Sequence, residues 1–155
     1  MEQKIKRVYV DTSAVLGNFD IDETRRQETD VFWNAVRSGE IVAVVSDVLN
    51  EELKEPSEHV WDFFAALPDS QIKWIERTAE SDTLAKQYIA ANVVTGKKMN
   101  DCRHVALASL HADGIVSWNL RDMVKRAKRY KNVNVAKGYP EIKIVTPNEY
   151  RRIYQ

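Results

Sequence analysis

The stretch that decides the fold reads Arg7-Val8-Tyr9-Val10-Asp11-Thr12-Ser13-Ala14-Val15-Leu16. Its apolar run at residues 8–10 predicts a strand buried on both faces, as in a parallel sheet. Asp11 follows at the carboxyl end of that strand, and in open α/β sheets this edge is where ligands bind. Aspartate also caps helices and turns. Asp11 is therefore either part of a site or a cap, and the presence of other acids near it distinguishes the two.

The rest of the chain alternates between strand-like and helix-like segments. Apolar runs predict strands at residues 41–45, 72–76, 114–118 and 141–147. Apolar residues at helical spacing predict helices at residues 20–38, 47–55, 57–67, 79–91 and 100–110. This alternation predicts an α/β fold with a mainly parallel sheet covered on both faces. The charged 72–76 strand is expected at an edge.

Length, charge and cysteine content limit the function classes. The 155 residues predict a single domain over residues 1–155. With 23 basic and 23 acidic residues, no net charge demands a nucleic-acid partner, so a local patch would have to bind one. Cys102, the only cysteine, is interpreted as a packing residue and not a nucleophile. No apolar run reaches membrane-spanning length and no signal-peptide core is evident, so we expect a cytoplasmic protein without membrane association.

Two adjacent glutamates in the predicted 47–55 helix have different surroundings. Glu52 lies four residues after Val48 and three after Leu49, so it shares the apolar face of that helix. Glu51 lies on the acidic face and is expected to be solvated. A carboxylate on an inward face is costly unless it has partners. Glu52 is therefore the functional candidate, and the alternative is a helix-edge acid paired with a lysine.

A third acid opens the predicted 100–110 helix. Asn100 is a suitable N-cap, and Asp101 lies in the first turn, where the helix dipole favours a carboxylate by ~0.3–1 kcal/mol. That structural role alone explains Asp101, which is weak evidence for a site by itself. His104 and His111 are seven residues apart and have no other soft ligand nearby. They are interpreted as packing or surface residues and not as a zinc site.

A basic cluster follows the predicted 114–118 strand. Asn119 comes at the carboxyl end of that strand, in the position that Asp11 holds after the first one. The cluster that follows contains Arg121, Lys125, Arg126 and Arg129. Such a run is usually a solvated helix face, but beside an acidic cleft it can hold a phosphate backbone. We predict that binding role for these four residues.

Three acids stand out because they can reach the same edge of the sheet: Asp11, Glu52 and Asp101. Converging carboxylates repel one another, and protons or a cation must neutralise them. Ligand sets made only of oxygen select hard cations, so Mg²⁺ or Mn²⁺ is the expected occupant. Such ions bind phosphates and activate water. The sequence therefore predicts metal-dependent phosphate chemistry.

The chain also resembles PIN-domain ribonucleases of the VapC type, in the subgroup with a Ser-Trp-Asn motif. The resemblance covers nearly the whole chain in the right order. Its motifs are Val10-Asp11-Thr12-Ser13, residues 46–53, Asn100-Asp101 with residues 102–108, Val116-Ser117-Trp118-Asn119, and residues 138–147.

This resemblance implies a three-layer α/β/α sandwich and a Mg²⁺- or Mn²⁺-dependent endoribonuclease that is often a homodimer and often silenced by a small antitoxin. Carried over by position, the metal-binding and catalytic carboxylates would be Asp11, Glu52 and Asp101. Thr12 or Ser13 would orient Asp11 by a hydrogen bond. RNA would be the substrate.

One departure from the family pattern concerns the fourth acid. Many PIN nucleases have a carboxylate where this chain has Asn119, and Asp122, three residues further on, is a possible substitute. The neutral Asn119 keeps a second reading open, a PIN-fold RNA-binding or regulatory module with little or no turnover. Phosphoaspartate phosphatases also begin with a strand that ends in Asp, but they require a second acid where this chain has Ser13.

Overall fold

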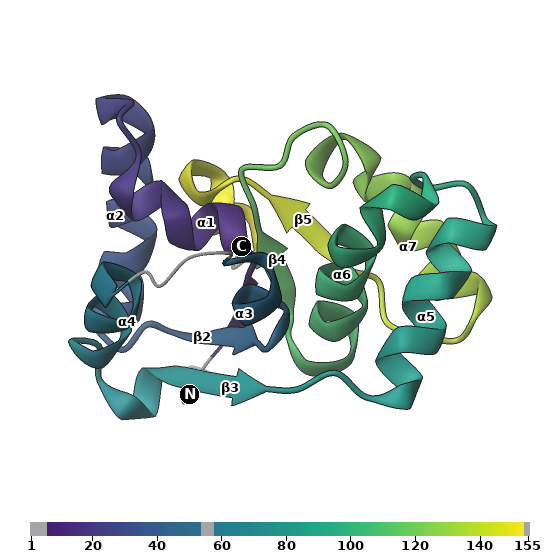
Figure 1. Cartoon of the computed structure of the whole chain (residues 1–155), viewed down its shortest axis with the longest axis horizontal. Helices are drawn as coiled ribbons and strands as arrows, with labels where there is room; N and C mark the ends of the chain where they lie inside the picture. Colours follow the sequence, from purple (N-terminus) through teal and green to yellow (C-terminus); the bar gives the residue numbers. More distant parts are fainter. Residues whose placement is uncertain (1–5, 54–57, 154–155) are drawn as a thin grey trace.

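The computed structural model describes residues 6–53 and 58–153. Its centre is a sheet of five parallel strands in the order β3-β2-β1-β4-β5 (Figure 1). The strands are β1 (Lys6–Val10), β2 (Ile41–Ser46), β3 (Ile72–Ile75), β4 (Gly114–Val116) and β5 (Lys143–Val145). The predicted α/β class with a parallel sheet is confirmed, and β3 lies at an edge as its charges indicated.

Helices cover both faces of the sheet (Figure 1). They are α1 (Thr12–Leu16), α2 (Glu23–Arg37), α3 (Val48–Glu52), α4 (Glu58–Ala65), α5 (Ala79–Ala90), α6 (Met99–His111) and α7 (Ala127–Ala136). Short 3-10 helices span Gly17–Phe19, Asp69–Gln71, Gly96–Lys98, Val124–Arg126 and Pro147–Ile153. No helix in the described ranges combines the length and apolar character needed to cross a membrane.

Strand β1 separates two hydrophobic cores. Val8 and Val10 face the core that contains Trp33 of α2 and Phe64 of α4. Tyr9 points to the opposite core, formed with α5, α6 and α7. Burying each large apolar side chain contributes roughly 1.5–3 kcal/mol. The strand that ends at Asp11 is therefore held from both sides, and the position of Asp11 is well defined.

Local signals set the ends of several helices. The side chain of Asp22 accepts a hydrogen bond from the backbone N–H of Arg25 and begins α2. Gly39 follows α2 with a φ of +85°, a conformation that favours glycine and stops the helix. Thr78 and Ser81 form a capping box that begins α5.

Two predicted helices near the sheet edge have different limits in the structure, and the basic segment after β4 is divided. The 47–55 helix is shorter, because α3 ends at Glu52; its predicted end before Pro56 lies outside the described residues. The 100–110 helix begins earlier, at Met99, because the 3-10 turn Gly96–Lys98 runs directly into it. Asn100 is therefore inside the helix, and its predicted role as N-cap is wrong. The basic segment 120–130 is not one helix but a loop, a 3-10 turn and the start of α7.

Candidate active site

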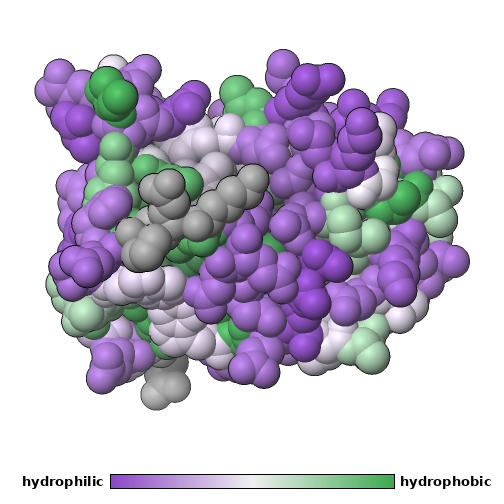
Figure 2. All heavy atoms as spheres, in the orientation of Figure 1, coloured by the Kyte–Doolittle hydropathy of each residue, from purple (hydrophilic) through white to green (hydrophobic). Residues whose placement is uncertain are grey.

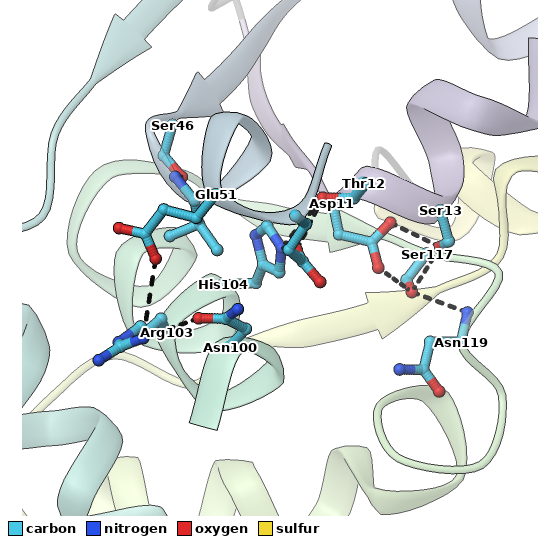
Figure 3. A network of polar contacts seen from close by, with 12 residues as sticks. Asp11, Thr12, Ser13, Ser46, Glu51, Asn100, Arg103, His104, Ser117 and Asn119 are labelled. Atoms are coloured by element: carbon cyan, nitrogen blue, oxygen red, sulfur yellow. Dashed lines mark hydrogen bonds and ion pairs between the residues drawn. The ribbon is translucent and has the colours of Figure 1, made fainter. Parts of the chain in front are cut away.

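Asp11 sits at the carboxyl end of β1, where it is 3% exposed. Its Oδ1 accepts hydrogen bonds from the hydroxyl of Ser13 at 2.7 Å and from the backbone N–H of Ala14 at 3.0 Å. Its Oδ2 accepts one from the hydroxyl of Ser117 at 2.5 Å (Figure 3). Burial raises the pKa of Asp11, while the charge of His104 and these hydrogen bonds oppose that rise. Asp11 caps the short helix α1 and also presents a fixed carboxylate at the sheet edge.

Ser117, not Asn119, is the counterpart of Asp11 on the neighbouring strand. The parallel register pairs Val10 with Val116, so the residues that follow them lie side by side. The predicted equivalence of Asn119 and Asp11 is therefore wrong, because β4 ends two residues earlier than predicted. The backbone N–H of Asn119 donates to the Ser117 hydroxyl at 2.9 Å, which leaves that hydroxyl's hydrogen for Asp11.

Glu52 lies at the end of α3 beside two side chains from other elements. Its Oε1 accepts a hydrogen bond from the Thr12 hydroxyl at 2.7 Å and contacts Nε2 of His104 at 2.5 Å. Burial raises the pKa of Glu52, but the hydrogen bond and charge of His104 and the bond from Thr12 outweigh it, so the pKa lies below its ordinary value. Thr12 thus contacts Glu52, whereas Ser13 contacts Asp11.

His104 is an internal partner of Glu52 and not only a packing residue. It is 2% exposed, and its Nδ1 lies 2.7 Å from the hydroxyl of Tyr9, which lies 2.7 Å from the hydroxyl of Ser46. An ionised carboxylate only accepts hydrogen bonds, so Nε2 must carry a hydrogen toward Glu52. The chain of contacts from Ser46 to Thr12 fixes the ring of His104 and, through it, the carboxylate of Glu52.

Asp101 opens α6 and lies in the electrostatic field of the other acids. Its pKa is raised to about 6, mainly by burial and also by the charges of Asp122, Glu52 and Asp11, while the charge of His104 opposes the rise. A carboxyl group responds to charges in this way only when they lie nearby. Acids from β1, α3, α6 and the loop after β4 therefore face one region of the molecule.

Asp122 belongs to this region because of the turn that follows β4. The side chain of Asn119 accepts a hydrogen bond from the backbone N–H of Asp122 at 3.1 Å and so shapes the turn. Asp122 is 8% exposed and pairs with Lys98 at 3.4 Å. A carboxylate thus lies three residues after Asn119, paired with Lys98.

Glu51 is not simply solvated, as its position on the acidic face suggested. It forms ion pairs with Arg77 at 3.0 Å and with Arg103 at 3.8 Å. Arg103 also donates to the side chain of Asn100 at 2.8 Å (Figure 3). These contacts tie α3 to α6 at the rim of the acidic region.

The four basic residues predicted to bind RNA do not form one patch. Arg121 and Arg126 line a cleft together with Lys98 and Asp122. Arg129 lines a second groove, between α5 and α7, that shares Asn92 with this cleft. Arg121, Lys125 and Arg129 are exposed, whereas Arg126 is partly buried. The 3-10 turn Val124–Arg126, which lies between the loop and α7, separates Arg121 from Arg129 along the chain.

The acidic region opens into a cleft of about 380 Å³ lined by Glu52, Asp101 and Asn119 and by basic residues of the 97–103 segment. Carboxylate oxygens are the ligands that Mg²⁺ and Mn²⁺ prefer, and burial, followed by the charges of neighbouring acids, raises the pKa of Asp101, so a cation there would favour its ionised form. Within the described part of the chain, no three His, Cys, Asp or Glu side chains are already close enough to hold an ion. The donor chemistry fits a hard divalent cation, and binding it would require side-chain rotations.

Comparisons with known proteins bear on the fold. No family model matches the sequence, and no curated protein does. Among solved structures, Mycobacterium tuberculosis VapC20, described as a toxin that cleaves the sarcin-ricin loop, superposes with a TM-score of 0.51 over 88% of this chain and 98% of its own, at 16% identity. This chain has a PIN-like fold. The likeness is one of fold, and the chemistry of this PIN-like chain is inferred from its own side chains.

Three residues of the site were not predicted in their roles. His104 was predicted to be a packing or surface residue, although its position three residues after Asp101 places both on one side of α6. Ser117 lay inside the predicted strand. Because β4 ends at Val116, Ser117 lies beyond the strand, where its hydroxyl donates to Asp11. Tyr9 alternates with Val8 and Val10, so its contact with the site required knowing what covers its face of the sheet.

Proposed function

We propose that this protein is a metal-dependent endoribonuclease that hydrolyses phosphodiester bonds of RNA. The observation that carries the proposal is geometric: Asp11 lies at the carboxyl end of β1 beside Ser117, and Glu52 and Asp101 line one cleft. Four carboxylates from separate segments share one field at the carboxyl edge of the parallel sheet, which is where α/β proteins bind ligands. The PIN-like fold shared with the RNA-cleaving toxin VapC20 supports the same class of reaction.

In this proposal Asp11 and Asp101 are the principal ligands of Mg²⁺ or Mn²⁺, and Glu52 is the third acid. When bound, the ion supplies Lewis acidity and neutralises phosphate charge. Ser13 and Ser117 hold the carboxylate of Asp11 in one orientation. Because both of its oxygens already accept hydrogen bonds, Asp11 cannot rotate freely. Asp11 is therefore already oriented, and the side-chain rotations that ion binding requires would be those of Glu52 and Asp101.

Glu52 has a different environment, which suggests a different part in the reaction. Thr12 and His104 keep it ionised and directed along the rim of the cleft. An ionised carboxylate next to a bound phosphate ester can accept a proton from water. We assign Glu52 a role as ligand or proton acceptor, and His104 as the residue that positions it.

The test is cleavage of labelled single-stranded RNA with Mg²⁺, with Mn²⁺ and with a chelator. We expect cleavage only with a divalent ion, and we expect Asp11→Asn to reduce it by at least ~100-fold, because a first ligand matters more than the outer contacts whose loss costs ~10–100-fold. Asp62→Asn, which removes an exposed carboxylate of α4, is the matched control. If RNA binds but is not cleaved with either ion, the protein is instead a PIN-fold RNA-binding module.

A small antitoxin partner is a further part of the proposal, because VapC20 is described as a toxin. Growth arrest on expression of this chain, relieved by co-expression of the adjacent reading frame, would support it. Homodimerisation stays a prediction, which analytical ultracentrifugation tests.

A further inference from the structure

Three clefts adjoin one another along one side of the molecule. The site cleft of about 380 Å³ contains Asp101 and Lys98. The loop cleft, of about 230 Å³, lies between the 92–98 segment and the 121–126 turn and shares Lys98. The helix groove, of about 670 Å³, lies between α5 and α7 and shares Asn92 with the loop cleft. Because each cleft shares a lining residue with the next, the three clefts follow one another from the acidic site to α7, whose neighbour in Figure 1 is α5.

The charge along this path changes from mixed to basic. The site cleft is lined by two acids, Glu52 and Asp101, and by three basic residues of the 97–103 segment. The loop cleft has three cations, Lys98, Arg121 and Arg126, and one acid, which pairs with Lys98. The helix groove has two basic residues and no acidic one among those that line it. A polyanion would therefore be attracted along the path, most strongly in the loop cleft and the helix groove, where the excess of basic over acidic residues is larger.

Two hydrogen bonds to backbone carbonyls hold the Arg126 side chain in place before an anion binds. Its Nη1 donates to the carbonyl of Val93 at 3.0 Å, and its Nε contacts the carbonyl of Arg121 at 3.4 Å. These bonds use two of the five guanidinium N–H groups and restrain the side chain, and the others stay available for a phosphate. A restrained cation loses less conformational entropy on binding than a free one.

The helix groove has the composition of a surface for unpaired nucleotides. Ala90, Ala91 and Ala136 supply small apolar surface, and Asn92 and Asn132 supply amide groups that can hydrogen-bond to base edges. A duplex would present its phosphates and hide these base edges. Hydrophilic residues dominate the face seen in Figure 2, with hydrophobic ones in separate small patches, in agreement with contacts made mainly by polar groups.

We propose that the loop cleft and the helix groove form a binding track for single-stranded RNA on one side of the cleavage point. Lys98, Arg121 and Arg126 hold a phosphate next to the acidic site, and Arg129 and Lys137 hold the strand further along. The inference rests on the proposed function for its choice of RNA and of the cleavage point. It assigns Arg126 and Arg129 to successive positions of one strand and leaves Lys125 outside the track.

The test is binding of labelled single-stranded RNA to the full chain in a chelator, followed by fluorescence anisotropy over a series of salt concentrations. We expect Arg126→Ala and Arg129→Ala each to weaken binding roughly fivefold and to reduce the salt slope by about 0.7, the value for one lost phosphate contact on a single strand. Lys128→Ala is the matched control, because Lys128 is an exposed cation of α7 that lines none of the three clefts. It is expected to leave binding unchanged.

Equal losses for Lys128→Ala and Arg129→Ala would overturn the track in favour of diffuse attraction, as would duplex RNA binding as tightly as the single strand. Arg129→Ala keeps the test valid if Arg126→Ala disturbs the 92–98 loop. Cleavage with unchanged binding in both variants would refute the track and leave the nuclease proposal intact. Weakened binding in both variants, together with no cleavage by the native chain in any divalent ion, would support the track and refute the nuclease proposal.

Discussion

Replacing Asp101 with asparagine is expected to stabilise the metal-free protein at neutral pH. The pKa of Asp101 is raised from 3.8 to about 6 in the folded chain. Each pKa unit corresponds to about 1.4 kcal/mol, so ionising this group costs the folded state at most ~3 kcal/mol. Asp101 is only partly buried, and solvent screening reduces this to ~1.5 kcal/mol.

Two further effects set the net value and its pH dependence. Asparagine loses the attraction of a carboxylate to the start of α6, ~0.3–1 kcal/mol, which leaves a net gain of about 0.5–1 kcal/mol. Because the folded pKa lies above the unfolded one, the native chain loses stability as pH rises from 3.8 to about 6 and stays at the lower level above that. The advantage of the variant is therefore full at neutral pH and disappears in acid.

Urea or thermal unfolding in the presence of a chelator, across this pH range, measures the difference in the free energy of unfolding between Asp101→Asn and the native chain. A gain of this size corresponds to a rise in melting temperature of ~1–4 °C for a chain of 155 residues. Asp62→Asn is the control and is expected to change stability by less than ~0.5 kcal/mol at any pH. An Asp101→Asn protein that is no more stable than the native chain at neutral pH, or whose advantage does not depend on pH, would refute the raised pKa of Asp101.

Two other substitutions test the surroundings of the site. His104→Ala removes a hydrogen bond to a carboxylate and one to Tyr9, so it is expected to destabilise the fold by ~2–4 kcal/mol in denaturant unfolding. His111→Ala, on the same helix, is expected to cost less than ~1 kcal/mol, and equal costs would contradict the network. Gly17→Ala would place its Cβ 2.6 Å from the hydroxyl of Thr29 and 3.0 Å from the indole nitrogen of Trp118, so we expect a loss of ~1–3 kcal/mol in the same assay.

Local patterns were sufficient to predict much of the architecture. The apolar run before Asp11, the β-branched run of β2 and the helical spacing of α2 each report burial on a known face, because side chains repeat every two residues in strands and every 3.6 in helices. The alternation of these segments predicted the parallel sheet. Asp11 followed from the same logic, since a polar residue directly after a buried strand must lie at the sheet edge.

The ends of helices and strands, and the contacts between individual side chains, were harder to predict from the sequence. β4 ends before Ser117, and the loop after it bends through the Asn119–Asp122 hydrogen bond, so the equivalence of Asn119 and Asp11 failed. The start of α6 was misplaced because a 3-10 turn continues into it without a side-chain cap. Strand and helix ends depend on a few hydrogen bonds, which sequence periodicity does not record.

The sequence by itself determined that this protein has a parallel α/β sheet, with Asp11 at its edge and Glu52 on an inward helix face. Only the tertiary structure decided that Glu52 contacts His104 and Thr12, that Ser117 supports Asp11, and that Asp122 joins the acidic region. The physical reason is that hydrophobic periodicity is a property of single segments, whereas hydrogen bonds and charge interactions at a site depend on how separate segments pack in space.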